Sequence, residues 1–134
     1  MTALHTGGCR CGAVRFMADA EPIRSSYCHC SDCRKATGAP VTAFVGFEQD
    51  AVVFEGEARR SFRNGRMERS FCGVCGSPLD YRDDGLPGNI YVYLGVMNEP
   101  ERFAPTLHAF ESERLSFLKV DDELPRFDRF SVER

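Results

Sequence analysis

Apolar and polar residues alternate in short runs along most of the chain, and glycine, proline or asparagine separates one run from the next. A period of two residues is typical of strands with one buried face. The pattern predicts strands over residues 13–17, 22–27, 41–47, 52–55, 58–62, 67–71 and 90–94. It shows none of the repeated helical crossovers that a parallel α/β sheet requires. We therefore predict a mainly β protein built from short antiparallel strands.

Two local signals refine this picture. The pair Asn64-Gly65 separates two of the predicted strands and is typical of a hairpin turn. Residues 31–37 predict one short helix, with Ser31 as its N-cap and Gly38 at its end. The C-terminal third is less regular and predicts little more than a helical turn near residues 111–115.

Length and charge narrow the class of protein. The 134 residues, 43% of them hydrophobic, predict a single domain spanning 1–134 with a real core. A net charge of −3 does not favour nonspecific nucleic-acid binding. No apolar run approaches the roughly 20 residues of a bilayer span, and the first five residues lack the features of a secretory signal. We expect a cytoplasmic protein without a nucleic-acid or membrane partner. An exposed aromatic surface could support a homodimer, although nothing in the pattern requires one.

Cysteine usage is the most informative feature of the composition. All seven cysteines fall in three tight clusters, which are Cys9-x-Cys11, Cys28-x-Cys30-x-x-Cys33 and Cys72-x-x-Cys75. An odd number cannot pair completely within one chain, and disulfide frameworks usually spread their cysteines to close longer loops. Thiolates one or two residues apart suit a metal ion instead, and a reducing cytoplasm preserves them.

The first and last clusters together predict a closed metal site. Cys72 and Cys75 flank Gly73, which permits a tight turn, and Cys9 with Cys11 supplies a second pair. Four thiolates are the tetrahedral ligand set of structural zinc. Buried free thiols and a redox Cys-x-x-Cys remain alternatives. The redox alternative is weakened because no βαβ pattern surrounds the last cluster.

The middle cluster predicts a zinc site with an open position. Cys28, Cys30 and Cys33 supply three ligands, and catalytic zinc characteristically has three protein ligands and one free position. A thiol bound there would have a lowered pKa. His29 is a candidate fourth ligand. Adjacent side chains of an extended segment point to opposite sides, which favours a hydrogen-bonding role for it.

Two cations follow the middle cluster directly. Zinc held by three thiolates has a formal charge of −1, so Arg34 and Lys35 would offset that charge or hold an acidic substrate. A solvated helix face explains the same pair equally well. Ser31 and Asp32 are candidates for helix capping or for contacts behind the ligands.

Three stretches of the sequence resemble the glutathione-dependent formaldehyde-activating (GFA) family, also called the CENP-V/GFA domain. They are GCRCGAVRF at residues 8–16, CHCSDCRKATG at 28–38 and FCGVCGSPL at 71–79, with a weaker match in the C-terminal region. All seven cysteines match in order and spacing. Phe110 and Phe117 stand where relatives commonly carry tryptophan.

The resemblance implies an Mss4-like, or β-tent, fold of short strands organised around two zinc ions per chain. It assigns Cys9, Cys11, Cys72 and Cys75 to a structural zinc, and Cys28, Cys30 and Cys33 to a catalytic one. Three ligands hold a metal less firmly than four, so we expect the second ion to be labile. The implied reaction is the condensation of glutathione, a co-substrate, with formaldehyde to S-hydroxymethylglutathione, which is classed as a carbon–sulfur lyase activity, or a reaction on a related thiol adduct. The alternatives are a non-catalytic zinc-containing module that binds glutathione or a protein, and a redox enzyme of the methionine sulfoxide reductase B type.

Overall fold

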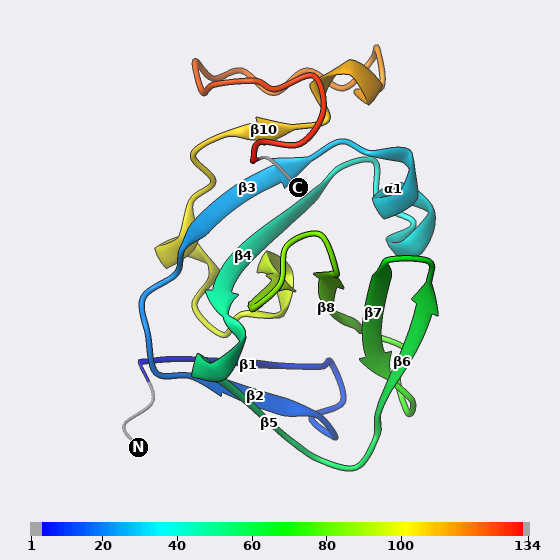
Figure 1. The fold of residues 1–134 in the computed structure, drawn as a ribbon, viewed down its shortest axis with the longest axis vertical. Coiled ribbons are helices and arrows are strands. Elements are labelled where there is room, and N and C mark those ends of the chain that lie inside the picture. Colours follow the sequence, from blue (N-terminus) through cyan, green and yellow to red (C-terminus); the bar gives the residue numbers. More distant parts are fainter. Residues whose placement is uncertain (1–3, 133–134) are drawn as a thin grey trace.

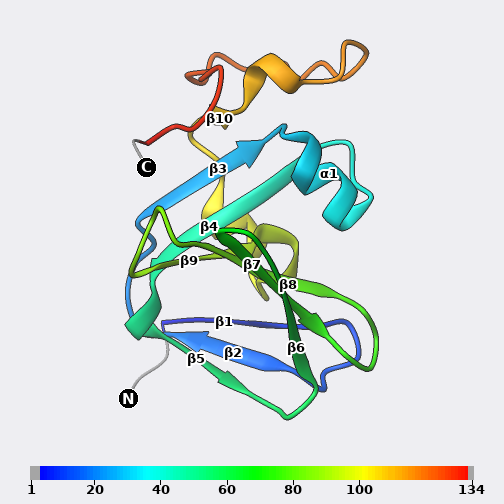
Figure 2. The same ribbon diagram turned by 45° about the vertical axis from the view of Figure 1, so that its right-hand side comes forward.

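The computed structural model describes residues 4–132, which form two β-sheets and one short α-helix (Figures 1 and 2). The smaller sheet has the order β1 (His5–Gly8), β2 (Arg15–Ala18), β5 (Val52–Glu55). The larger sheet has the order β10 (His108–Ala109), β3 (Arg24–Cys28), β4 (Thr42–Glu48), β9 (Asn89–Tyr93), β8 (Pro78–Asp83), β7 (Met67–Cys72), β6 (Arg59–Asn64). Strand neighbours are antiparallel except β10 and β3, which pair in parallel. The predicted fold class is confirmed.

Helical structure is limited to short segments. The helix α1 spans Ser31–Thr37, as predicted, and four 3-10 turns cover Gln49–Ala51, Leu94–Val96, Pro100–Phe103 and Glu111–Glu113. None of the helices within residues 4–132 has the length and hydropathy that a bilayer span requires. The prediction about the first five residues falls partly on residues 1–3, which lie outside the described part of the chain.

The N-cap of α1 differs from the prediction. Cys30 occupies the cap, and its Sγ accepts a hydrogen bond from the backbone N–H of Cys33 at 3.2 Å. Ser31 is the first helical residue instead. The helix ends at Gly38, whose φ of 79° is the left-handed conformation that glycine adopts readily. One cysteine of the middle cluster therefore also determines where the helix begins.

The hydrophobic pattern did not predict three of the strands, β1, β8 and β10. β1 contains two glycines, and a Cβ at Gly7 would meet the Phe16 ring at 2.3 Å, so close packing excludes a larger residue there. β8 begins with a proline and buries Asp80 completely, and Arg59 neutralises that carboxylate at 2.7 Å. β10 has only two residues. Tertiary contacts, which a periodicity does not record, place all three in sheets.

The larger sheet presents two different faces, because side chains alternate along each strand. One face packs toward the smaller sheet and forms a hydrophobic core with residues such as Val45, Phe47 and Val92. The opposite face carries Phe44 and Tyr91, which pack against the middle cysteine cluster. The sheet therefore separates the core from the region in which the candidate site lies.

The segment after β10 lies beside β3 and β10 and is drawn in orange and red in Figure 1. It is tied down by backbone hydrogen bonds of 2.8 Å, from Phe127 to the carbonyl of His108 and from Phe110 to the carbonyl of Arg129. Through these bonds the irregular C-terminal region becomes one wall of the cavity described below.

Candidate metal centres

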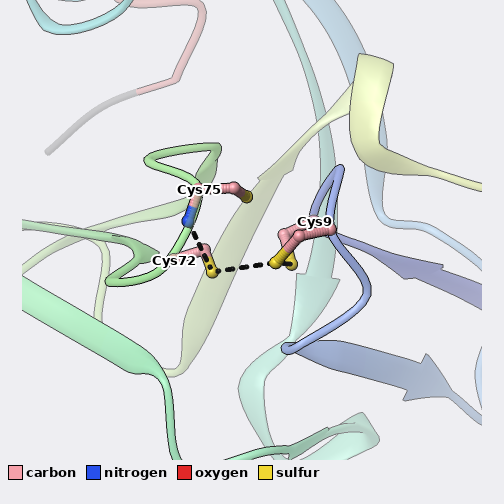
Figure 3. Close-up of side chains that lie close together, drawn as sticks. Cys9, Cys72 and Cys75 are labelled. Atoms are coloured by element: carbon pink, nitrogen blue, oxygen red, sulfur yellow. Dashed lines mark hydrogen bonds between the residues drawn. The ribbon is translucent and has the colours of Figure 1, made fainter.

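Four cysteines from two distant loops converge into one group. Cys9 and Cys11 lie in the β1–β2 loop, and Cys72 and Cys75 lie at the end of β7 and just beyond it; Figure 3 shows Cys72 and Cys75 facing Cys9. All four sulfurs lie within 4.8 Å of one another, with 3.6 Å between Cys9 and Cys11 and 3.7 Å between Cys11 and Cys72. Zn–S bonds of 2.3 Å in a tetrahedron place sulfurs about 3.8 Å apart. The spacing therefore fits one tetrahedral zinc ion.

Backbone N–H groups and one hydroxyl are directed at sulfurs of this group. The backbone N–H of Val14 donates to the Cys9 sulfur at 3.2 Å, and that of Cys75 donates to the Cys72 sulfur at 3.4 Å. The Ser77 hydroxyl lies 3.1 Å from the Cys75 sulfur, and this contact lowers the pKa of Cys75 to about 5. Donors directed at sulfur stabilise the deprotonated form that binds metal.

The middle cluster forms a second, separate group. Cys28 ends β3, Cys30 caps α1 and Cys33 lies in its first turn, so the strand-to-helix junction gathers three sulfurs within six residues. Cys33 lies 3.7 Å from Cys28 and 3.0 Å from Cys30, sulfur to sulfur. All three are buried and their sulfurs lie within 4.8 Å of one another, so the group could hold a metal ion with three protein ligands.

A cavity of about 280 Å³ adjoins the three-cysteine group. Its floor is the non-core face of the larger sheet, including Phe44 and Tyr91, and the C-terminal segment contributes Phe110 and Phe130. Cys28, Cys30 and Cys33 all line the cavity, whereas none of the four cysteines of the other group does. A position left open on the three-cysteine group would therefore face a space of ligand size. Phe117, by contrast, is 76% exposed and does not line the cavity.

Arg69, on β7, also belongs to the site and was not identified from the sequence. Its guanidinium donates to the Asp32 carboxylate and the Tyr93 hydroxyl, each at 2.7 Å, and to the Cys33 sulfur at 3.5 Å. Hydrogen bonds from Cys28, then from Cys30, with the nearby charge of Arg69, lower the pKa of Cys33 to about 3. No motif marks Arg69, because only the strand pairing brings β7 next to the cluster.

Arg34 and Lys35 lie elsewhere. The Arg34 guanidinium donates to the backbone oxygens of His29 at 2.6 Å and Glu113 at 2.7 Å, which ties α1 to the C-terminal segment. Lys35 is exposed on the helix, and neither residue lines the cavity. Their contact with glutathione stays a prediction. The lining cations are Arg24, Arg69 and Arg129.

The His29 side chain contacts His108 and Glu111 and is not part of the three-cysteine group. Its Nε2 lies 2.8 Å from His108 Nδ1 and 3.5 Å from a Glu111 oxygen, and His108 Nε2 lies 3.0 Å from Asp122. The two rings are nearly parallel, with centroids 5.1 Å apart, so the facing nitrogens point at each other. An ion between opposed nitrogens would separate them by about 4 Å. The group is therefore a hydrogen-bonded chain, and burial lowers the pKa of His29.

Comparison with known proteins gives matches that include the cysteine groups described above. A family model described as "Glutathione-dependent formaldehyde-activating enzyme" matches residues 4–113, which include all seven cysteines. A Halomonas elongata protein named "Putative glutathione-dependent formaldehyde-activating enzyme" is 30% identical over 113 residues, which cover 74% of this chain and 72% of the relative. The crystal structure of a Rhodobacter sphaeroides protein, a structural genomics target, aligns with a TM-score of 0.58 at 20% identity. That alignment covers 91% of this chain and 99% of the other and supports the fold alone.

Proposed function

Because the chain belongs to the glutathione-dependent formaldehyde-activating family, we propose that it is a zinc-dependent carbon–sulfur lyase that acts on glutathione and formaldehyde or a related thiol adduct. One observation carries this proposal beyond family membership. The three-cysteine group opens onto the cavity, whereas the four-cysteine group does not. Only the three-cysteine group can present an open metal position to a substrate.

The two groups would have separate roles in this proposal. Cys9, Cys11, Cys72 and Cys75 would hold a structural zinc ion, and Cys28, Cys30 and Cys33 would hold a catalytic one. Zinc at the three-cysteine group would lower the pKa of a thiol that occupies its open position. The protein would then supply the binding surface, the exclusion of water and the hydrogen bonds around the reacting atoms.

Arg69 is the residue best placed to assist the addition. The thiol sulfur forms a bond to the carbonyl carbon, the C=O electron pair moves to oxygen, and that oxygen takes up the proton lost by the thiol. A guanidinium has five N–H groups, and no residue among 4–132 accepts a hydrogen bond from Nε of Arg69. Asp32 and Tyr93 hold the guanidinium at the cavity wall, so it can donate to the developing oxyanion.

A thiol redox function would need Cys28, Cys30 or Cys33 as a free nucleophile and not as a metal ligand. Methionine sulfoxide reduction needs a reactive cysteine outside the metal ligands, and each of the seven cysteines lies in one of the two groups. A protein-binding module would not require three buried sulfurs that line a cavity with Arg69 beside them. A module that only binds glutathione would use the same cavity, and the kinetic measurement below distinguishes it from the lyase. The description of the matching family as an enzyme favours the lyase.

The test combines metal analysis with thiol binding and kinetics. We expect two zinc ions per chain, glutathione binding by calorimetry, and S-hydroxymethylglutathione exchange by NMR above the spontaneous rate. Cys33→Ala should lose one zinc and the glutathione binding together. A protein with both zinc ions that neither binds glutathione nor accelerates the exchange would refute the proposal.

A further inference from the structure

Arg24 differs from the other half-buried arginines in the described part of the chain. Arg59, Arg69, Arg82 and Arg114 each pair with a carboxylate, and Arg34 donates to two backbone oxygens. The Arg24 side chain forms neither an ion pair nor a hydrogen bond with any residue among 4–132, yet it lines the cavity. A partly desolvated charge without a counter-charge is unfavourable, so this position suits an anionic ligand.

The strand geometry places Arg24 at a defined distance from the sulfurs. Arg24, Ser26 and Cys28 alternate along β3, and all three line the cavity. A rise of about 3.3 Å per residue separates the Cα atoms of Arg24 and Cys28 by roughly 13 Å. The cavity therefore has sulfur ligands toward one end of β3 and an unpaired cation toward the other.

The neighbouring strands leave this end of the cavity lined by an aromatic ring. Gly46, on β4, pairs in register with Arg24 on β3 and with Tyr91 on β9. A Cβ at Gly46 would meet the Tyr91 ring at 2.9 Å, so that ring occupies the space above the glycine. Two carboxylates line the cavity, and both have other partners: Asp32 pairs with Arg69 at 2.7 Å, and Glu113 accepts a hydrogen bond from the backbone N–H of Ser31 at 2.9 Å.

We propose that Arg24 is a carboxylate-binding subsite, and that the cavity selects thiols that carry a carboxylate several bonds away from sulfur. The inference rests on the proposed function, because its other anchor is a thiol held at the three-cysteine group. Arginine matches a carboxylate with two parallel hydrogen bonds. The Cα atoms of Arg24 and Cys28 are roughly 13 Å apart, a separation that the extended γ-glutamyl arm of glutathione and the long Arg24 side chain can bridge together.

The test compares thiols with and without carboxylates on the zinc-loaded protein. Calorimetry would measure binding of glutathione, glutathione diethyl ester and 2-mercaptoethanol. We expect Arg24→Gln to weaken glutathione binding about 10- to 100-fold and to leave 2-mercaptoethanol binding unchanged. The diethyl ester should bind wild type and variant alike. Arg15→Gln is the matched control, because Arg15 is exposed on β2 and does not line the cavity.

Each outcome bears on a specific claim. Unchanged glutathione affinity in Arg24→Gln would overturn the subsite while wild-type glutathione binding still supports the lyase proposal. Equal losses for both thiols, with unchanged zinc content and thermal midpoint, would also overturn it, because the effect would then not depend on the carboxylate. If wild-type protein bound none of the thiols, the proposed function itself would fail and the subsite with it.

Discussion

The two cysteine groups should contribute unequally to stability, because they close loops of very different length. A metal bridge between Cys9 and Cys72 encloses about 60 residues, whereas one between Cys28 and Cys33 encloses about five. The chain-entropy relation for a cross-link gives about 4 kcal/mol for the first and about 2 kcal/mol for the second. We predict that Cys72→Ala lowers the free energy of unfolding by about 2 kcal/mol more than Cys33→Ala does.

These two substitutions are a matched pair. Both cysteines are buried, at 0% and 4% exposure, and both changes remove one sulfur, so their packing losses largely cancel. Urea unfolding and calorimetry of the zinc-loaded variants would measure the difference, which corresponds to about 6–8 °C in Tm for a chain of this size. The reasoning is refuted if Cys33→Ala is as destabilising as Cys72→Ala, or if Cys72→Ala retains both zinc ions.

Two further predictions concern charged groups. Arg69→Gln should lower kcat about 100-fold with little change in glutathione affinity, and Arg69→Lys should recover part of the rate. A kcat in Arg69→Gln equal to that of the wild type would exclude the oxyanion role. Desolvation alone would raise the pKa of Asp122. The hydrogen bond from His108 outweighs this effect and holds that pKa below its ordinary value of 3.8. The stability that this bond contributes is therefore complete above 3.8 and is lost as pH falls through the lowered pKa. Asp122→Asn should lack this part of the acid dependence in urea unfolding between pH 2 and 6, and an unchanged profile would contradict the assignment.

Local signals predicted the features that depend on neighbours in sequence. The bounds of α1 and the grouping of the cysteines follow from caps and from spacing. Arg69 and Arg24 could not be identified as site residues from the sequence. Their positions depend on which strands are neighbours in the sheet, and alternation alone does not specify that order. The cap at Cys30 was missed for a related reason. Its sulfur is a weak acceptor, and only the folded turn shows that it faces the N–H of Cys33.

The alternation along β4 and β9 has a consequence for how this family can diversify. Val45 and Val92 support folding, while their immediate neighbours Phe44 and Tyr91 line the cavity. A mutation at a cavity position can therefore alter which ligand fits while leaving the core between the two sheets unchanged. Relatives that share the same cysteine pattern can differ on the cavity face, and residues there, more than the cysteines, should record changes in the ligand.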